Sequence, residues 1–269
     1  YFANNIEFFA FWAGMGSDSA ILGAPQTQRN YAWRDYGNRV GIWRMFEVFD
    51  ELDMPLAHNI NASVLVHHPE IGERMLERGD EFVAHGMTNS ERQGEMWEEA
   101  EARLIAETTE TITKFTGKQP VGWMSPWLSQ TDVTLDLLQE AGYLFQCDWP
   151  LDDQPMWMRT RKGRILNMPY PVDTNDSPLV VNRHQTGREL AEIWIDQFDE
   201  MLDQARKGPH ALVCPFVLHT FILGQPFRLR QLRRVLEHIK SRGDEIWLTR
   251  PGEIASHVQS LPSGTVPGS

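Results

Sequence analysis

Cysteine, positive charge and long apolar runs are all scarce in this sequence of 269 residues. The two cysteines, Cys147 and Cys214, match no metal-binding spacing, and they fit either a reducing compartment or a single disulfide. The 25 basic residues are outnumbered by 37 acidic ones, and the net charge of −12 argues against partners such as nucleic acid or an anionic membrane surface. No apolar run approaches the length that spans a membrane. We therefore expect a cytoplasmic protein, with further residues upstream of Tyr1, because the sequence begins inside an expected strand.

Apolar segments with strand character alternate along the chain with segments of helical periodicity. The expected strands are residues 1–9, 55–61, 81–85, 122–124, 143–147, 165–169, 212–219 and 245–248. The expected helices are residues 40–52, 69–78, 91–115, 131–141, 188–207, 225–242 and 251–258. This order predicts a parallel sheet, and seven or eight such units suit a closed or nearly closed α/β barrel better than an open sheet.

The segments between these elements are expected to be irregular. Residues 10–39, 150–164 and 170–185 are read as loops, and such long loops in compact domains are usually functional. With no repeat and no linker in the sequence, we expect one domain over residues 1–260 and a loose tail over residues 261–269.

Several polar residues stand at the expected carboxyl ends of strands. Because parallel strands present these ends on one face, such residues can converge on one site. The candidates for catalysis are Glu7, His85, Asp148 and His219. Hydrolysis needs such a set, since a base or metal must activate water and an acid must protonate the leaving atom.

Three of these positions lie in motifs that resemble the polysaccharide deacetylase (NodB-homology) family. Residues 81–86 (EFVAHG) resemble its second motif, and residues 147–149 (CDW) resemble its aspartate–tryptophan motif. Residues 216–219 (FVLH) resemble its last motif, which implies that His219 is a general acid. Residues 34–44 and 224–228 are similar to the allantoinase-like branch. The resemblance implies a distorted (β/α) barrel, often oligomeric, that hydrolyses carbon–nitrogen bonds other than peptide bonds.

The sequence departs from the family at the metal site. Metal-dependent members hold zinc with one aspartate and two histidines that lie four residues apart. Here the first histidine is His85 and the second position is Asn89, while the motif that normally supplies two aspartates contains only Glu7. An amide is a poor zinc ligand. We therefore expect no cofactor, or a weakly bound divalent metal such as zinc with Glu7, His85 and Asn89 as its possible ligands.

The candidates for substrate binding are Arg34, Tyr36, Arg39, Asn89, Trp123 and Trp127. Both arginines are suited to gripping a carboxylate or ureido group, or to forming ion pairs with Asp35 or Glu47. The tryptophans, with Trp149, are suited to an aromatic wall or to the core. Asp148 either orients a histidine or caps a turn, and most acidic residues of the polar loops, including Asp176, are expected to cap turns.

Two classes of function remain open from the sequence. The first is a hydrolase of amide-type carbon–nitrogen bonds, whose partner is a small cyclic amide or ureide, or an N-acetyl sugar. The second is an inactive barrel that binds a sugar or metabolite. His219 is expected to protonate the leaving nitrogen, with His85 and Glu7 positioning water and Asn89 donating to the oxyanion. Ten tryptophans and loop aromatics favour a homo-oligomer, either a dimer or a tetramer.

Overall fold

The computed structural model describes residues 1–11 and 27–269. Its strands are β1 (Phe2–Ile6), β2 (Ala57–Ile60), β3 (Glu81–Ala84), β4 (Gly122–Trp123), β5 (Phe145–Gln146), β6 (Met156–Arg159), β7 (Arg164–Asn167) and β8 (Phe216–His219). Its α-helices are α1 (Gln28–Tyr36), α2 (Ile42–Glu51), α3 (Ala62–His67), α4 (Pro69–Arg78), α5 (Glu98–Thr116), α6 (Thr134–Glu140), α7 (Gly187–Lys207), α8 (Thr220–Leu223), α9 (Pro226–Lys240) and α10 (Pro251–Ser260).

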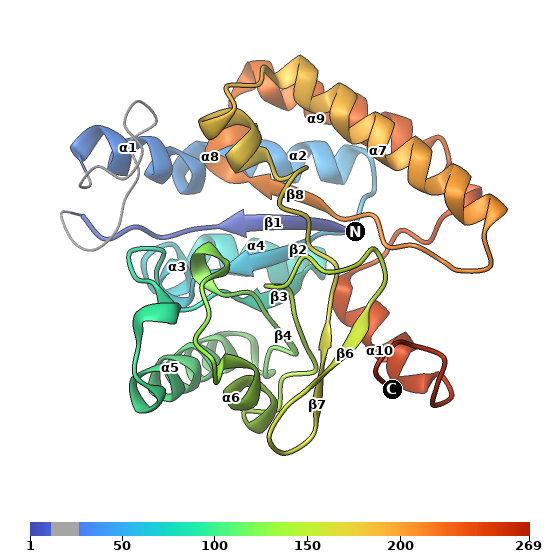
Figure 1. The fold of residues 1–269 in the computed structure, drawn as a ribbon. Coiled ribbons are helices and arrows are strands. Elements are labelled where there is room, and N and C mark those ends of the chain that lie inside the picture. Colours follow the sequence, from blue (N-terminus) through green and yellow to red (C-terminus); the bar gives the residue numbers. More distant parts are fainter. Residues whose placement is uncertain (12–26) are drawn as a thin grey trace.

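The strands form one curved sheet with the order β6-β7-β5-β4-β3-β2-β1-β8 (Figure 1). Every pair of neighbours is parallel except β6 and β7, which form an antiparallel hairpin. The predicted α/β fold with a distorted barrel is confirmed, although within the described chain β6 and β8 do not pair and so do not close the barrel. None of the described helices has the length and apolarity needed to cross a membrane.

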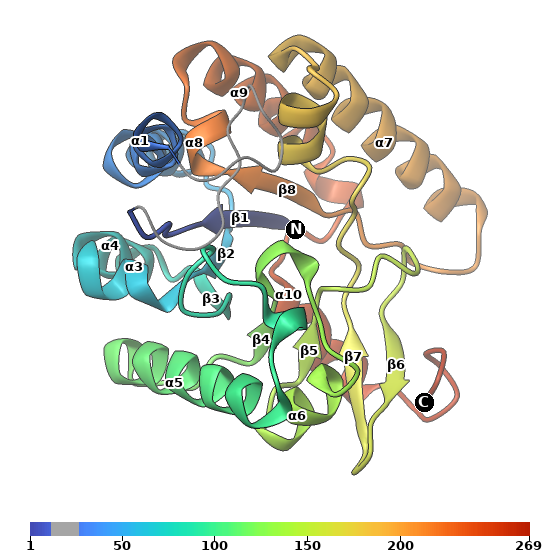
Figure 2. The same ribbon diagram turned by 60° about the vertical axis from the view of Figure 1, so that its left-hand side comes forward.

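Two apolar clusters lie on opposite faces of the sheet. The outer cluster joins Phe2 and Ile6 of β1 to the surrounding helices, whereas the inner one joins Tyr1 and Ala3 to apolar residues of other strands. Helix α10 packs its apolar side against this inner cluster, and Figure 2 shows it beside the strands of the lower half. Because successive side chains of a strand point to opposite faces, Glu7 continues the row that faces inward.

Four parts of the sequence prediction are corrected by the structure. Residues 28–36, expected within a loop, form α1, and residues 12–26 of that loop lie outside the described chain. Strand β6 lies within the expected loop 150–164, and its half-exposed edge residues carry little strand signal. Residues 245–248 form no strand, since a 3₁₀ turn (Gly243–Glu245) is followed by irregular chain. The tail is docked on β6, because Pro267 accepts a hydrogen bond from the Trp157 amide at 2.8 Å.

Two further segments that were expected to be irregular contain helical turns. The two cysteines do not form the disulfide that the sequence had left open. A π-helical turn (Gly37–Gly41) follows α1, and a second (Pro178–Asn182) lies within residues 170–185. Cys147 and Cys214 are both free thiols, so they form no disulfide.

Glu81, at the start of β3, accepts a hydrogen bond from the first turn of α10. The Gly252 amide donates to its Oε2 at 3.0 Å, and burial raises the pKa of Glu81 from 4.5 to about 7. Because the folded protein favours the protonated carboxyl, wild-type stability should fall as the pH rises from about 4.5 through about 7. We expect Glu81→Gln to be more stable than wild type at pH 8 by about 1–3 kcal/mol and to differ little from it below pH ~4.5.

Urea unfolding of both proteins across this pH range would measure the difference. Glu70→Gln, on the exposed side of α4, is the control, and its effect should not change with pH in this way. A Glu81→Gln advantage that is independent of pH would contradict the prediction.

Candidate active site

Glu7 is the centre of a buried polar cluster just beyond the carboxyl end of β1. Its Oε2 lies 3.4 Å from Arg34 Nη1, and its Oε1 lies 3.6 Å from His219 Nε2. Asn89 donates its side-chain amide to Glu7 Oε1, and Asn38 Nδ2 donates to the Glu7 carbonyl at 2.8 Å. One carboxylate therefore connects residues from β1, α1, β8 and the loop after β3.

The strand register explains why these residues meet. Asn5 on β1 is paired with His219 on β8 and with Asn59 on β2, so all three occupy one level of the barrel. Glu7 lies two residues further along β1, at the next level on the same face. His85 directly follows β3, and its Nδ1 donates to the Met124 carbonyl at 2.7 Å. Since a carbonyl only accepts, Nδ1 carries the proton and Nε2 is left as an acceptor.

His219 is held by a buried aspartate that the sequence prediction assigned to turn capping. Asp176 Oδ1 lies 2.5 Å from His219 Nδ1, and its Oδ2 accepts the His219 backbone amide at 2.8 Å. Burial lowers the pKa of His219, but the charges of Asp176 and Glu7 outweigh this effect and raise it above its ordinary value. The Nδ1 contact turns Nε2 toward Glu7.

His85 has the opposite electrostatic setting. Burial lowers the pKa of His85 below its ordinary value, and the nearby charge of Glu7 offsets this only in part. Its Nε2 is buried and has no hydrogen-bond partner among the described residues. The cluster thus contains a neutral imidazole with a free acceptor and a second imidazole that favours its protonated form. Opposite pKa shifts in neighbouring groups are the usual basis of an acid and base pair.

Glycines set the position of the chain beyond His219. Helix α8 follows this histidine directly, and the π-helical turn Gly37–Gly41 packs against it. A Cβ added to Gly41 would lie 2.2 Å from the Thr220 carbonyl oxygen, too close for any side chain. The glycines of residues 34–44 and 224–228 therefore allow the backbones around the site to approach closely.

The structure does not bring every predicted residue to this cluster. Asp148 accepts hydrogen bonds from the Ser125 amide and from Gln130, so it holds a turn, and no hydrogen bond or ion pair joins it to a histidine of the described residues. Trp123 is fully buried in the outer core, which rules out the aromatic wall for this residue. Arg39 is 71% exposed and pairs with Asp35 at 3.9 Å, and the Tyr36 hydroxyl accepts from Arg44.

Trp127 and Trp149 are both partly exposed, and Trp127 contacts the loop after β3. The Trp127 indole donates to the Asn89 carbonyl at 3.0 Å, and the Trp149 indole donates to Gln130 at 2.7 Å. Trp127 has a φ of 64° and Leu128 one of 54°, both in the left-handed region that non-glycine residues adopt at a cost. This strained turn keeps the Trp127 ring against the loop that contains Asn89.

The residues present do not fit the zinc site of the family's metal-dependent members. The Asn89 oxygen accepts from Asn61 Nδ2 at 3.0 Å, and its NH₂ group donates to Glu7. Only Glu7 and His85 then remain of the three possible ligands. Across residues 1–11 and 27–269, no group of three or more His, Cys, Asp or Glu side chains is arranged to hold a metal ion.

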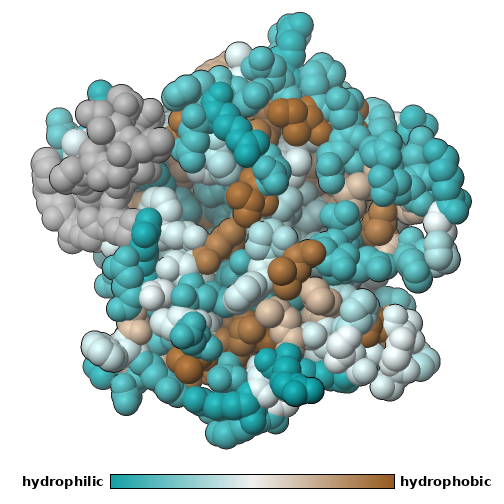
Figure 3. All heavy atoms as spheres, viewed as in Figure 1, coloured by the Kyte–Doolittle hydropathy of each residue, from teal (hydrophilic) through white to brown (hydrophobic). Residues whose placement is uncertain are grey.

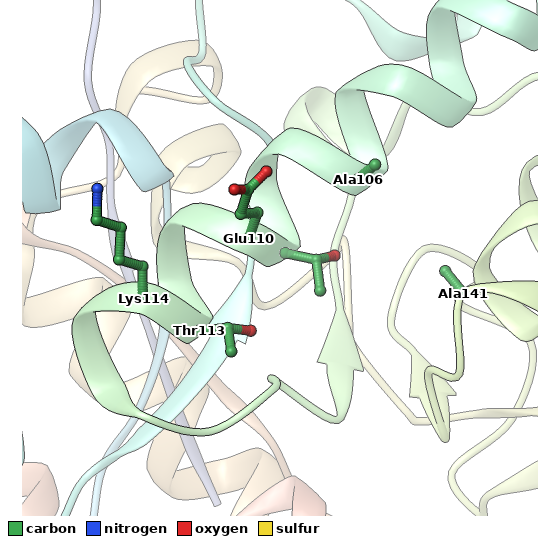
Figure 4. A pocket seen from close by; sticks show the side chains of 6 residues that line it. Ala106, Glu110, Thr113, Lys114 and Ala141 are labelled. Atoms are coloured by element: carbon green, nitrogen blue, oxygen red, sulfur yellow. The ribbon is translucent and has the colours of Figure 1, made fainter.

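One hollow of the described chain lies away from this cluster. Its volume is about 530 Å³, and it is lined by Ala141 and one side of α5, with Glu110 and Lys114 at its edge (Figure 4). No histidine lines it, and its residues come from helices outside the sheet. We assign no function to it. On the surface seen in Figure 3, hydrophobic residues form separate groups near the centre, and the homo-oligomer stays a prediction.

A family model for polysaccharide deacetylases matches residues 31–145. A peptidoglycan deacetylase of Helicobacter pylori is 22% identical over 247 residues, covering 80% of this chain and 82% of that protein.

Two solved structures share the fold over nearly the whole chain. A probable polysaccharide deacetylase of Pseudomonas aeruginosa PAO1 has a TM-score of 0.83 at 26% identity, covering 95% of this chain and 89% of that one. The Puue allantoinase has a TM-score of 0.86 at 28% identity, covering 98% and 91%. The chain therefore has the fold of the polysaccharide deacetylases. The resemblance to that family, predicted from the motifs around His85 and His219, is confirmed.

Proposed function

We propose that this protein hydrolyses a carbon–nitrogen bond in a small cyclic ureide or amide, in the manner of an allantoinase. The observation that supports this most is the pair of buried histidines around Glu7, whose pKa values are shifted in opposite directions. A small substrate is favoured because Glu7, His85 and His219 are all buried. The similarity to an allantoinase over 98% of the chain agrees with this substrate class.

In the proposed reaction, water donates a hydrogen bond to the free Nε2 of neutral His85 and is oriented by the Glu7 carboxylate. Its oxygen attacks the carbonyl carbon, and its proton passes to His85. The carbon–nitrogen bond then breaks as protonated His219 delivers its Nε2 proton to the departing nitrogen. The products are a carboxylic acid and an amine or urea nitrogen. The Arg34 guanidinium, beside Glu7, supplies positive charge for the oxyanion that forms in between.

A second candidate is the removal of acetyl groups from an N-acetyl sugar. The partly exposed faces of Trp127 and Trp149, 37% and 41% exposed, favour it, because aromatic rings provide flat surfaces for sugar rings. The Helicobacter pylori relative is named a peptidoglycan deacetylase. The same histidines would serve this reaction, with acetate as the acid released.

Turnover of a defined substrate panel would distinguish these functions. The panel contains allantoin, hydantoin, succinimide and N-acetylglucosamine oligomers, each assayed with and without a chelator. We expect the purified protein to open at least one cyclic ureide, at a rate that chelator treatment leaves unchanged. Acetate release from the sugars alone would support the second candidate. No turnover of any compound would overturn the proposal and support the inactive binding barrel.

A further inference from the structure

Helix α1 turns a polar face toward the protein interior. The buried residues of this helix are Asn30 and Arg34, and Asn38 in the following π-helical turn is buried as well. Residues four apart on a helix lie one above the other on the same face. Figure 1 shows α1 beyond the carboxyl end of β1.

Two of these three side chains hold Glu7. Arg34 pairs with its carboxylate at 3.4 Å, and Asn38 donates to its carbonyl at 2.8 Å. The Arg34 guanidinium also lies 4.1 Å from the Phe9 ring centre, which places this face of α1 against the segment that leaves β1. The ring of Tyr31, next to Asn30, lies 5.0 Å from that of Phe11 in the same segment.

Asn30 is the third residue, and the protein leaves its side chain unsatisfied. It is 1% exposed, yet neither its Nδ2 nor its Oδ1 has a hydrogen-bond partner among residues 1–11 and 27–269. Its backbone amide, in contrast, donates to Thr27 Oγ1 at 3.1 Å. A buried carboxamide without partners is destabilising, so such a group in a native protein calls for an explanation. A substrate that supplies both partners is a physical reason to keep it.

We infer that Asn30 is a substrate-recognition residue that binds an amide edge carrying N–H and C=O side by side. A primary carboxamide offers its donor and its acceptor on one edge, so its best partner is an amide in the cis arrangement. Small rings, such as cyclic ureides and imides, enforce that arrangement. An acetamido group on a sugar is trans, with its N–H and C=O pointing in opposite directions.

This inference rests on the proposed function, because it names the part of the substrate that the same site holds. It also favours a cyclic ureide over an N-acetyl sugar as the substrate. Asn30 can make two hydrogen bonds to a cyclic ureide but only one to an acetamido group. A site built to hydrogen-bond its substrate discriminates strongly against compounds that leave its polar groups unpaired.

The test is Asn30→Leu, which keeps the approximate volume and removes both polar atoms. We expect hydantoin affinity, measured by calorimetry, and kcat/KM for the cyclic ureide to fall by about 10–100-fold. Activity toward an acyclic acetamide, where present, should fall by less than about 10-fold, because only one hydrogen bond is lost. The melting temperature should rise, because an unsatisfied buried amide has been removed. Loss of binding together with a gain in stability would not result from a merely structural role.

Gln28→Leu is the matched control, since it makes the same change on the exposed side of α1. It should leave hydantoin binding unchanged. Wild-type hydantoin affinity in Asn30→Leu, or a lower melting temperature, would overturn the inference even if the wild type hydrolyses a ureide. Asn30-dependent binding of hydantoin without any turnover would keep the inference and reject the proposed hydrolysis.

Discussion

Replacing His219 with alanine should lower kcat by about 10²–10⁴-fold, because general acid catalysis is typically worth that much. The leaving nitrogen must be protonated as the bond breaks, and Nε2 of His219, which faces Glu7, is the proposed proton donor. KM should change little, since this proton matters in the transition state more than in binding. Steady-state kinetics on the best substrate of the panel, with circular dichroism to verify the fold, would measure the effect.

His219→Gln should be nearly as slow, because glutamine keeps a hydrogen bond but cannot transfer the proton. The control is His238→Ala on α9, which removes a histidine paired with Asp199 at 2.8 Å, outside the site. It should keep nearly full activity. If His219→Ala or His219→Gln retained more than about a tenth of wild-type kcat, His219 would be structural and the proposed mechanism wrong.

Asp176→Asn should lower kcat/KM by about 10²-fold at neutral pH, through His219 rather than by contact with substrate. The Asp176 charge raises the pKa of His219, so its removal lets burial lower that pKa. The proposed mechanism requires neutral His85 and protonated His219. The wild-type profile should therefore be bell-shaped, with an acid limb below the ordinary histidine value of 6.5 and an alkaline limb above it. In Asp176→Asn the alkaline limb should move to lower pH.

The pH profile separates this positioning role from a general loss of structure. A merely destabilised protein would lose activity without moving the alkaline limb. Asp173→Asn is the matched control, because Asp173 is in the same segment but exposed and paired with Arg183 at 3.0 Å. It should behave as wild type. If the alkaline limb of Asp176→Asn lay at the wild-type pH, a group other than His219 would determine its position.

The fold was largely predictable because most of its elements bury apolar faces. The strands around β1 and the amphipathic helices such as α7 have the periodicity that marks these elements. Helix α1 was missed for the opposite reason. Its buried residues are Asn30 and Arg34, so a search for apolar periodicity finds no helix there. Strand β6 was missed because its residues at the edge of the sheet are half-exposed or exposed and so lack a buried apolar pattern.

The site was only partly predictable. Strand ends pointed to Glu7, His85 and His219, and the structure brings these residues together, although their catalytic roles stay predictions. Asp176 lies in an irregular segment 43 residues before His219, and local sequence carries no sign of their contact. Asp152 and Asn175 do cap turns as expected, so nothing but the fold distinguishes Asp176 from them. The role of Trp123 as a core residue likewise could not be predicted, because the sequence does not show that its side chain is buried.

The pairing of β1 with β8 also determines when the site can form. A side-chain bond from Asn5 to the Leu218 carbonyl spans 213 residues, so the first strand meets one of its two neighbours only after almost the whole chain has been made. Contacts this distant in sequence slow folding. Until β8 is in place, the unpaired edge of β1 can pair with strands of other chains. A chain folded only through β5 would hold Glu7 and His85 without the proposed acid. Catalysis should therefore appear only at the last folding step, when β8 pairs with β1.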